Sequence, residues 1–293
     1  MNNTSLLKIG IKSKQKNIIS ASRRTDIPAF YGEWFFEQVK QGFAKVRNPF
    51  SGKYSEISLE LQDVGAIVFW SKNYLPFLPI LDKIDSIYEK RFVFHFTITG
   101  FSAEVQKILE PFVPHSSISI KTAKILAERY DADKVLWRFD PIIFSNLSLF
   151  EERLETFSKL ADSLEGFTRR CYISFIDLYG KVKRKLDNIT NSGKINFIKP
   201  AINEQVEFAK RVKEIALEHG IQVFTCCEDT IGRMADIPKG HCIDAVLLSK
   251  LFPEIQFTDT IHPTRKECGC YESKDIGTYN TCRHGCVYCY ASR

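Results

Sequence analysis

The segment FVFHFTIT, Phe92–Thr99, has the composition of a β-strand, because aromatic and β-branched residues dominate it and Gly100 follows it. Side chains of a strand alternate between its two faces, so the polar residues at every second position from His95 to Thr99 share one face. The residues between them are Phe or Ile and share the other face. We interpret the apolar face as packed on helices and the polar face as lining a cavity for a polar ligand, since unpaired buried charges are costly.

Six further apolar runs are candidate strands, and most of them stop at a polar or charged motif. Segments with a helical apolar period lie between several of these runs, and strands that alternate with helices predict a parallel sheet. Seven strands suffice for a barrel. We therefore predict an α/β chain with a (β/α) TIM-barrel-like or partial-barrel domain over residues 16–260, an N-terminal extension over 1–15 and a Cys-rich segment over 261–293. The other strands are expected at Ile18–Ser22, Phe43–Val46, Ala66–Trp70, Val135–Phe139, Tyr172–Ile176 and Ile221–Thr225, and helices at Ser119–Tyr130, Ser148–Gly166 and Asn203–Gly220.

Charged and amide side chains recur at the carboxyl ends of the predicted strands, where barrels of this type place their sites. Such side chains donate hydrogen bonds to carboxylate or phosphate oxygens, so they are candidates for binding a polar ligand or cofactor. Two alternatives stay open: Arg138 and Asp140 form a closed ion pair, or Arg23 and Arg24 are a solvated pair beside a helix that starts near Pro28. The candidates are Arg23, Arg24, Asp26, Arg47, Lys72, Asn73, Arg138 and Asp140.

The composition narrows the class of protein. Hydrophobic residues make up 44% of the 293 residues, so the chain can bury a substantial core, and no stretch approaches the roughly 18 apolar residues of a membrane span. The 41 Lys and Arg residues exceed the 35 Asp and Glu residues, a net charge of +6 that permits nucleic acid or another anionic ligand without requiring it. The first residues lack the apolar core of a secretory signal, so we expect a cytoplasmic protein with no membrane partner.

The cysteines indicate a metal site. Eight of the nine follow residue 225, and a reducing cytosol argues against a disulfide framework. Cys282, Cys286 and Cys289 have the spacing C-x3-C-x2-C, with which three thiolates can bind three irons of a cubane cluster and leave the fourth without a nearby protein ligand. Zinc and a set of unrelated exposed thiols are the alternatives. His284 lies within this motif and is expected to donate a hydrogen bond near the site, not to bind the metal.

Four further cysteines form a candidate second site for an auxiliary iron-sulfur cluster or a zinc ion, although buried cysteines also behave as small hydrophobic side chains. Cys227 would point away from Cys226 if the preceding strand continued, so we expect one of the two to belong to the site. Cys171 lies alone in a predicted strand and is expected in the core. The candidate ligands of the second site are Cys226, Cys242, Cys268 and Cys270.

The C-terminal motif resembles the cluster motif of radical S-adenosylmethionine (SAM) enzymes, with Tyr288 as the aromatic residue before the last cysteine. The segment HGCVYCYA, His284–Ala291, is especially similar to the branch of spore photoproduct lyase and DNA-repair-photolyase-like proteins. Over nearly its full length the chain also resembles a bacterial family, domain of unknown function 1848. The segments that carry this second resemblance are Ser20–Pro28, Arg47–Phe50, Phe69–Asn73, Arg138–Pro141, Cys242–Asp244 and Cys268–Cys270.

The resemblance to radical SAM enzymes implies a 4Fe-4S cluster on Cys282, Cys286 and Cys289, with SAM as a candidate ligand of the open iron. Reductive cleavage of SAM would give a 5′-deoxyadenosyl radical that abstracts hydrogen from the substrate, so an electron donor would be a partner. In those enzymes the motif follows the first barrel strand, whereas here it lies near the C-terminal end, as in a circular permutation.

We therefore expect an iron-sulfur protein with lyase-type or oxidoreductase chemistry on an unidentified substrate at the barrel mouth. The alternative is a non-catalytic barrel module, stabilised by metal, that binds nucleic acid or another anionic ligand.

Overall fold

The computed structural model describes residues 15–49 and 51–292, so residues 1–14 of the predicted N-terminal extension lie outside the described part. A seven-stranded sheet with the order β10-β8-β6-β5-β4-β1-β11 forms the centre of the molecule, and its neighbouring strands are all parallel. Within the described residues β10 and β11 are its two edges, so the sheet is open. The α/β class is confirmed, but the sheet does not close into a TIM barrel. Its strands are β1 (Asn17–Ala21), β4 (Val64–Ser71), β5 (Phe92–Thr97), β6 (Val135–Ile142), β8 (Arg170–Phe175), β10 (Gln222–Thr225) and β11 (Lys274–Asp275).

One predicted strand lies outside this sheet. β2 (Phe43–Arg47) forms an antiparallel hairpin with β3 (Tyr54–Ser58), and every second residue of β2 from Lys45 onward is exposed. A strand of a parallel sheet is covered on both faces, and β2 is covered on only one. The seventh place in the sheet belongs to β11, which the sequence did not predict because this strand is short and polar.

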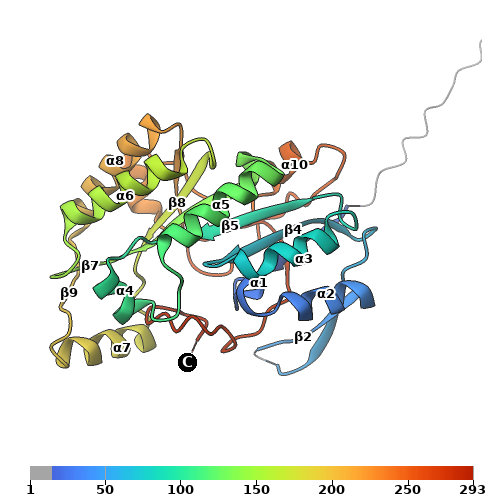
Figure 1. The fold of residues 1–293 in the computed structure, drawn as a ribbon, viewed down its shortest axis with the longest axis horizontal. Coiled ribbons are helices and arrows are strands. Elements are labelled where there is room, and N and C mark those ends of the chain that lie inside the picture. The colour runs from blue at the N-terminus through green and yellow to red at the C-terminus, as the bar shows by residue number, and fades with distance from the viewer. Residues whose placement is uncertain (1–14, 50, 293) are drawn as a thin grey trace, which may run out of the picture.

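Helices cover one face of the sheet, as the aromatic residues of that face predicted. Figure 1 shows α3, α5, α6 and α8 along this side. Phe69, Phe94, Trp137 and Phe139 are buried beneath them in the largest apolar cluster. Cys171 belongs to the same cluster, which agrees with its expected place in the core. These helices are α3 (Leu78–Ile84), α5 (Ser116–Tyr130), α6 (Phe150–Leu164) and α8 (Ile202–Glu218).

The chain that follows β10 covers the opposite face of the sheet. Residues Val68, Val93 and Leu136 point to this side and pack against Ile243 and Leu248 in a second apolar cluster. His95, which was expected to line a ligand cavity, is fully buried here, and its Nε2 atom lies 2.7 Å from the Cys242 carbonyl oxygen. At His95 the polar face of the sheet is therefore closed by the protein itself.

The remaining elements are short or lie around the carboxyl edge of the sheet. The final segment of the chain runs along this edge beside α1, α4 and α7, far in sequence from all three (Figure 1). These elements are α1 (Ile27–Phe30), α2 (Gly32–Gln41), η1 (Leu75–Phe77), α4 (Ala103–Leu109), η2 (Ala132–Lys134), β7 (Phe144–Ser145), α7 (Gly180–Asn191), β9 (Phe197–Ile198), α9 (Asp229–Ala235) and α10 (Ala245–Leu251).

Candidate metal centre

The motif of Cys282, Cys286 and Cys289 lies at the carboxyl ends of β1 and β4, and Asp26 connects it to both strands. Asp26 follows β1 and caps α1 by accepting a hydrogen bond from the Ala29 amide at 2.9 Å. It also accepts hydrogen bonds from the Ser71 hydroxyl at 2.7 Å and from the Lys72 amide at 2.9 Å, both at the end of β4. Its fourth partner is Nε2 of His284, at 2.8 Å.

His284 fixes the cysteine loop from within. The imidazole is 2% exposed, and its two nitrogens face Asp26 and the Phe112 carbonyl oxygen, the latter at 3.2 Å. Both nitrogens are thus hydrogen-bonded inside the protein, and neither is available to a metal. This arrangement agrees with the expectation that His284 supports the site without binding metal.

The three cysteines of the motif differ in burial. Cys286 is 8% exposed, and Cys282 and Cys289 are half-buried. Burial raises the pKa of the Cys286 thiol well above its ordinary value, although the Lys72 ammonium opposes this shift. Burial also raises the pKa of Cys282, to about 11. Metal binding supplies the positive charge that stabilises thiolates in such a place.

The spacing of these sulfurs bears on the kind of metal. Zinc with bonds of about 2.3 Å would hold tetrahedral sulfur ligands about 3.8 Å apart. In the described part of the chain, the three sulfurs of the motif do not all lie within 4.8 Å of one another. The arrangement is therefore wider than one zinc ion requires.

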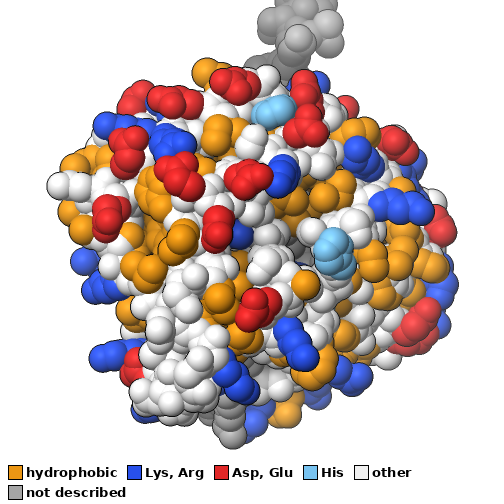
Figure 2. Space-filling model, turned by 60° about the vertical axis from the view of Figure 1, so that its left-hand side comes forward, with side chains coloured by type: hydrophobic (Ala, Val, Ile, Leu, Met, Phe, Trp, Pro, Cys, Tyr) orange, Lys and Arg blue, Asp and Glu red, His pale blue; other side chains and the backbone are white. Residues whose placement is uncertain are grey.

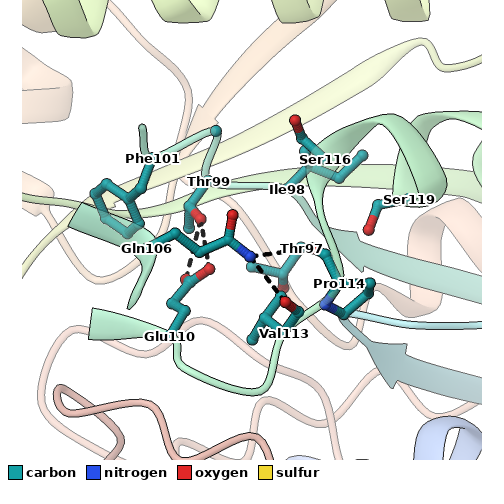
Figure 3. Close-up of a pocket in the computed structure, with 11 residues that line it drawn as sticks. Thr97, Ile98, Thr99, Phe101, Gln106, Glu110, Val113, Pro114, Ser116 and Ser119 are labelled. Atoms are coloured by element: carbon teal, nitrogen blue, oxygen red, sulfur yellow. Dashed lines mark hydrogen bonds between the residues drawn. The ribbon is translucent and has the colours of Figure 1, made fainter. Parts of the chain in front are cut away.

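A buried charged network lies beneath the motif. Lys72 Nζ is 2.9 Å from Glu110 Oε1, and the Tyr288 hydroxyl donates to the same oxygen. Burial alone would raise the pKa of Glu110, but the Lys72 ammonium and the hydrogen bond from Tyr288 outweigh it and hold that pKa below its ordinary value. The Thr99 hydroxyl lies 3.0 Å from both Glu110 oxygens, and Figure 3 shows this contact beside Gln106. The sequence did not single out Glu110. This residue thus connects the ends of β4 and β5 to the C-terminal segment that carries the cysteine motif, which we call the tail.

Arg23 and Arg24 meet a carboxylate that the sequence also did not single out. Asp275 in β11 accepts hydrogen bonds from the Ser22 hydroxyl at 2.7 Å and the Arg23 amide at 2.9 Å. The Arg23 and Arg24 Nε atoms each lie 3.8 Å from an Asp275 oxygen. Arg23 Nη1 is buried and has no hydrogen-bond partner within residues 15–49 and 51–292. Tyr290 donates to the Arg23 carbonyl oxygen at 2.6 Å, so the backbone of Arg23 contacts the C-terminal segment.

Arg138 and Asp140 form the ion pair that was one of the two interpretations of the sequence. Arg138 Nε is 3.1 Å from Asp140 Oδ2, and Arg138 Nη1 is 3.0 Å from the Cys242 sulfur. The Ser174 hydroxyl donates to the other Asp140 oxygen. The guanidinium is therefore saturated by a carboxylate and by sulfur, with the pair held inside the fold.

Two predicted residues lie apart from this assembly. Arg47 is exposed in the β2–β3 hairpin, where its Nε atom is 3.4 Å from the Gly52 carbonyl oxygen. Asn73 accepts a hydrogen bond from the Leu75 amide at 3.2 Å and shapes the turn before η1. Arg47 is the last residue of β2, which is not part of the sheet, and Asn73 follows β4 but stabilises its own turn.

The second set of cysteines is gathered at the end of β10. Cys226 and Cys242 have their sulfurs 3.2 Å apart, and Cys268 and Cys270 lie next to them. The condition under which Cys227 would point away is not met, because β10 ends at Thr225 and Cys227 has a φ of 59°. This left-handed conformation turns its side chain towards Cys226 and Cys268.

A cavity of 450 Å³ opens at the carboxyl ends of β6 and β8, beside α7. Glu228, which follows Cys227, lines one side, and burial raises the pKa of this carboxyl to about 7. Ile143 and Leu186 line another side and belong to the apolar cluster on which Tyr288 packs. The volume is in the range of small-molecule sites. Figure 2 shows acidic and basic side chains interspersed over one face of the molecule.

No described helix is long and apolar enough to cross a membrane. A search of curated proteins found no match to the chain. The family described as "Domain of unknown function (DUF1848)" matches residues 18–291, a range that includes both groups of cysteines and the whole sheet except Asn17. The chain is therefore a member of the DUF1848 family.

Proposed function

We propose that this protein is an iron-sulfur enzyme related in mechanism to radical SAM enzymes, with a 4Fe-4S cluster on Cys282, Cys286 and Cys289. The observation that carries the proposal is the place of the motif: Cys286 is buried at the carboxyl ends of parallel strands, beside Lys72 and Glu110. The carboxyl edge of a parallel sheet is where such folds bind ligands. In this proposal the open sheet takes the place of the barrel of radical SAM enzymes and presents the motif at its carboxyl edge.

The donor set fits the cluster. The three thiols at this spacing are soft ligands suited to iron, and their separation exceeds that of a zinc site. When bound, a cluster with one open iron would supply single electrons to SAM or to another ligand at that iron. His284 and Asp26 hold the loop, and the Lys72 ammonium offsets thiolate charge. Tyr288 and the apolar cluster beneath it exclude water from the inner side of the motif.

The ligands of such an enzyme would lie on the inner side of the tail. Arg23 Nη1, which has no partner among the described residues, would donate to the carboxylate of SAM or of the substrate. The 450 Å³ cavity beside Glu228 and Tyr288's apolar cluster would hold the substrate. Radical or redox chemistry in this site requires an electron donor as a partner and a reducing compartment such as the cytoplasm.

Anaerobic reconstitution with iron and sulfide tests the proposal. We expect protein-bound iron at Cys282, Cys286 and Cys289, and reductant-dependent cleavage of SAM to 5′-deoxyadenosine. Cys286→Ala should abolish cleavage, whereas the control Cys171→Ala removes a core thiol and should retain it. Full SAM cleavage by Cys286→Ala would contradict the proposal.

The rival function is a non-catalytic module in which metal ties the tail to the sheet. The tail already has protein partners: Tyr31 donates to the Thr281 carbonyl oxygen at 2.6 Å, and the Val287 amide donates to Leu109 at 3.0 Å. Metal is therefore not needed to dock it, which favours the enzyme. Stoichiometric zinc without SAM cleavage in the reconstituted protein would instead support the module.

A further inference from the structure

Five cysteine sulfurs outside the C-terminal motif converge from three separate segments of the chain. Cys226 and Cys227 follow β10, Cys242 lies in the loop before α10, and Cys268 and Cys270 lie in the loop before β11. The side chains form a continuous ring of neighbours, from Cys226 through Cys227, Cys268, Cys270 and Cys242 back to Cys226. All five are free thiols.

Four of these five sulfurs lie inside the protein. Cys226, Cys242, Cys268 and Cys270 are 6%, 7%, 8% and 3% exposed, whereas Cys227 is half-buried. Each buried cysteine belongs to the apolar cluster beneath the sheet, where water is excluded. A set of reduced sulfurs from three loops in a dry place is the usual composition of a soft-metal site.

Cationic donors point at this group. Arg138 is buried, and its guanidinium reaches Cys242 at 3.0 Å and Cys226 at 3.6 Å. Arg265 Nε lies 3.1 Å from the Cys227 sulfur. A neutral thiol is a weak acceptor, so these guanidinium groups are better matched by negatively charged sulfur. Arg138 also pairs with Asp140 and Arg265 with Asp177, so both act here as oriented hydrogen-bond donors to sulfur.

Further donors surround the sulfurs on the other side. The Ile243 amide lies 3.5 Å from the Cys270 sulfur, and the Cys270 amide lies 3.5 Å from the Cys268 sulfur. The Thr264 hydroxyl also lies 3.5 Å from Cys268. Hydrogen bonds to the ligand sulfurs of iron-sulfur clusters stabilise the thiolates and tune the metal.

The spacing argues against a single zinc ion here as well. Although Cys226 and Cys242 are 3.2 Å apart, no three of the five sulfurs lie within 4.8 Å of one another in the described structure. A tetrahedral zinc site requires all ligands to be about 3.8 Å apart. The Cys226 and Cys242 sulfurs would move apart to bind different irons of a cluster.

We propose that Cys226, Cys242, Cys268 and Cys270 bind a second 4Fe-4S cluster, distinct from the one at the C-terminal motif. Cys227 stays outside the ligand set, held half-exposed by Arg265. Four protein ligands leave no iron free for substrate, so this second cluster is fully coordinated. The inference rests on different residues from the proposed function and stands or falls separately.

The test counts iron and sulfide per chain after anaerobic reconstitution. Wild-type protein should bind about eight irons, and a variant with Cys282, Cys286 and Cys289 all changed to Ala should keep about four. This variant leaves the second group and the core untouched, so it tests the second site without disturbing the fold. Cys242→Ala combined with Cys270→Ala should lose about four irons, while Cys227→Ala and the core control Cys171→Ala should lose none.

Three results would overturn the inference. One is a folded C-terminal triple variant, verified by circular dichroism, that binds no iron. Another is stoichiometric zinc at the second group after reconstitution with excess iron. The third is a disulfide between Cys226 and Cys242 in anaerobically prepared protein, shown by thiol labelling. If the triple variant instead retains all of the wild-type iron, the cluster of the proposed function fails while the second site survives.

Discussion

Asp26→Asn perturbs the contact that joins the start of the sheet to the cysteine tail. The carboxylate is buried and accepts four hydrogen bonds, two on each oxygen. Asparagine has the same shape but presents an NH₂ group in place of one oxygen. The least costly orientation points this group towards Ser71, whose hydroxyl can turn, and leaves the Ala29 amide without an acceptor.

The magnitude follows from these four contacts. An unsatisfied buried amide costs about 1–3 kcal/mol, and each bond to Lys72 and His284 weakens by about 1 kcal/mol when its acceptor loses its charge. We therefore expect the free energy of unfolding to fall by about 3–5 kcal/mol. The assay is urea unfolding, with all proteins prepared anaerobically in the same metal state. Asp236→Asn is the matched control, because Asp236 is fully exposed, and it should change stability by less than about 0.5 kcal/mol.

A double-mutant cycle with His284→Gln isolates the contact between tail and sheet. Because Asp26 and His284 are directly bonded, their effects should fail to add by about 1 kcal/mol or more. A loss below about 1 kcal/mol for Asp26→Asn, or strict additivity in the cycle, would refute the view that this pair anchors the motif.

The remaining predictions concern the charged network, the cysteine loop and the unpaired arginine. Glu110→Gln leaves the Lys72 ammonium buried without its charged partner, so urea unfolding should show a free energy of unfolding lower by about 3 kcal/mol. The control is Glu33→Gln at an exposed ion pair, and an equally small loss in both variants would contradict this prediction. Gly285→Ala should lower the free energy of unfolding by about 1 kcal/mol more than Gly166→Ala does in the same assay. Both glycines have a positive φ, but only at Gly285 would the new Cβ contact Phe112, at 3.0 Å. Equal losses would mean that the Phe112 ring moves aside without cost. Arg23→Gln should raise the Kd of SAM, measured by calorimetry, about tenfold, as expected for one lost charge-assisted hydrogen bond. The control Arg47→Gln changes an exposed side chain and should leave the Kd unchanged. Equal affinities for wild type and Arg23→Gln would exclude Arg23 as a SAM contact.

The sequence predicted the elements whose local pattern agrees with their tertiary place. Six of the seven expected strands lie in the parallel sheet, and the three periodic segments correspond to α5, α6 and α8. The aromatic face of Phe92–Thr97 packs on helices as predicted. Each of these features depends on the periodic pattern of apolar and polar side chains over a short segment, and such local patterns can be recognised in a single sequence.

The features that the sequence did not reveal depend on distant contacts. β11 is a pair of polar residues whose strand character comes from β1, and Asp275 acquires its partners only through that pairing. Glu110 lies after α4 with no motif around it, yet it bonds a residue 178 positions away. The cover over His95 is irregular chain without any period. Cys227 was expected to point away from Cys226 only if the strand continued, and β10 ends at Thr225.

The bond between His284 and Asp26 spans 258 positions, and this separation orders events during synthesis. A ribosome adds roughly 5–20 residues each second, so β1, β4 and α4 leave it well before the cysteine loop is made. Until the cysteine loop is made, Asp26, Lys72 and Glu110 lack the contacts that they make with it. The site proposed to bind the cluster is thus completed after the framework beneath it, and a nascent chain interrupted before Cys282 would expose that framework without the three thiols of the motif.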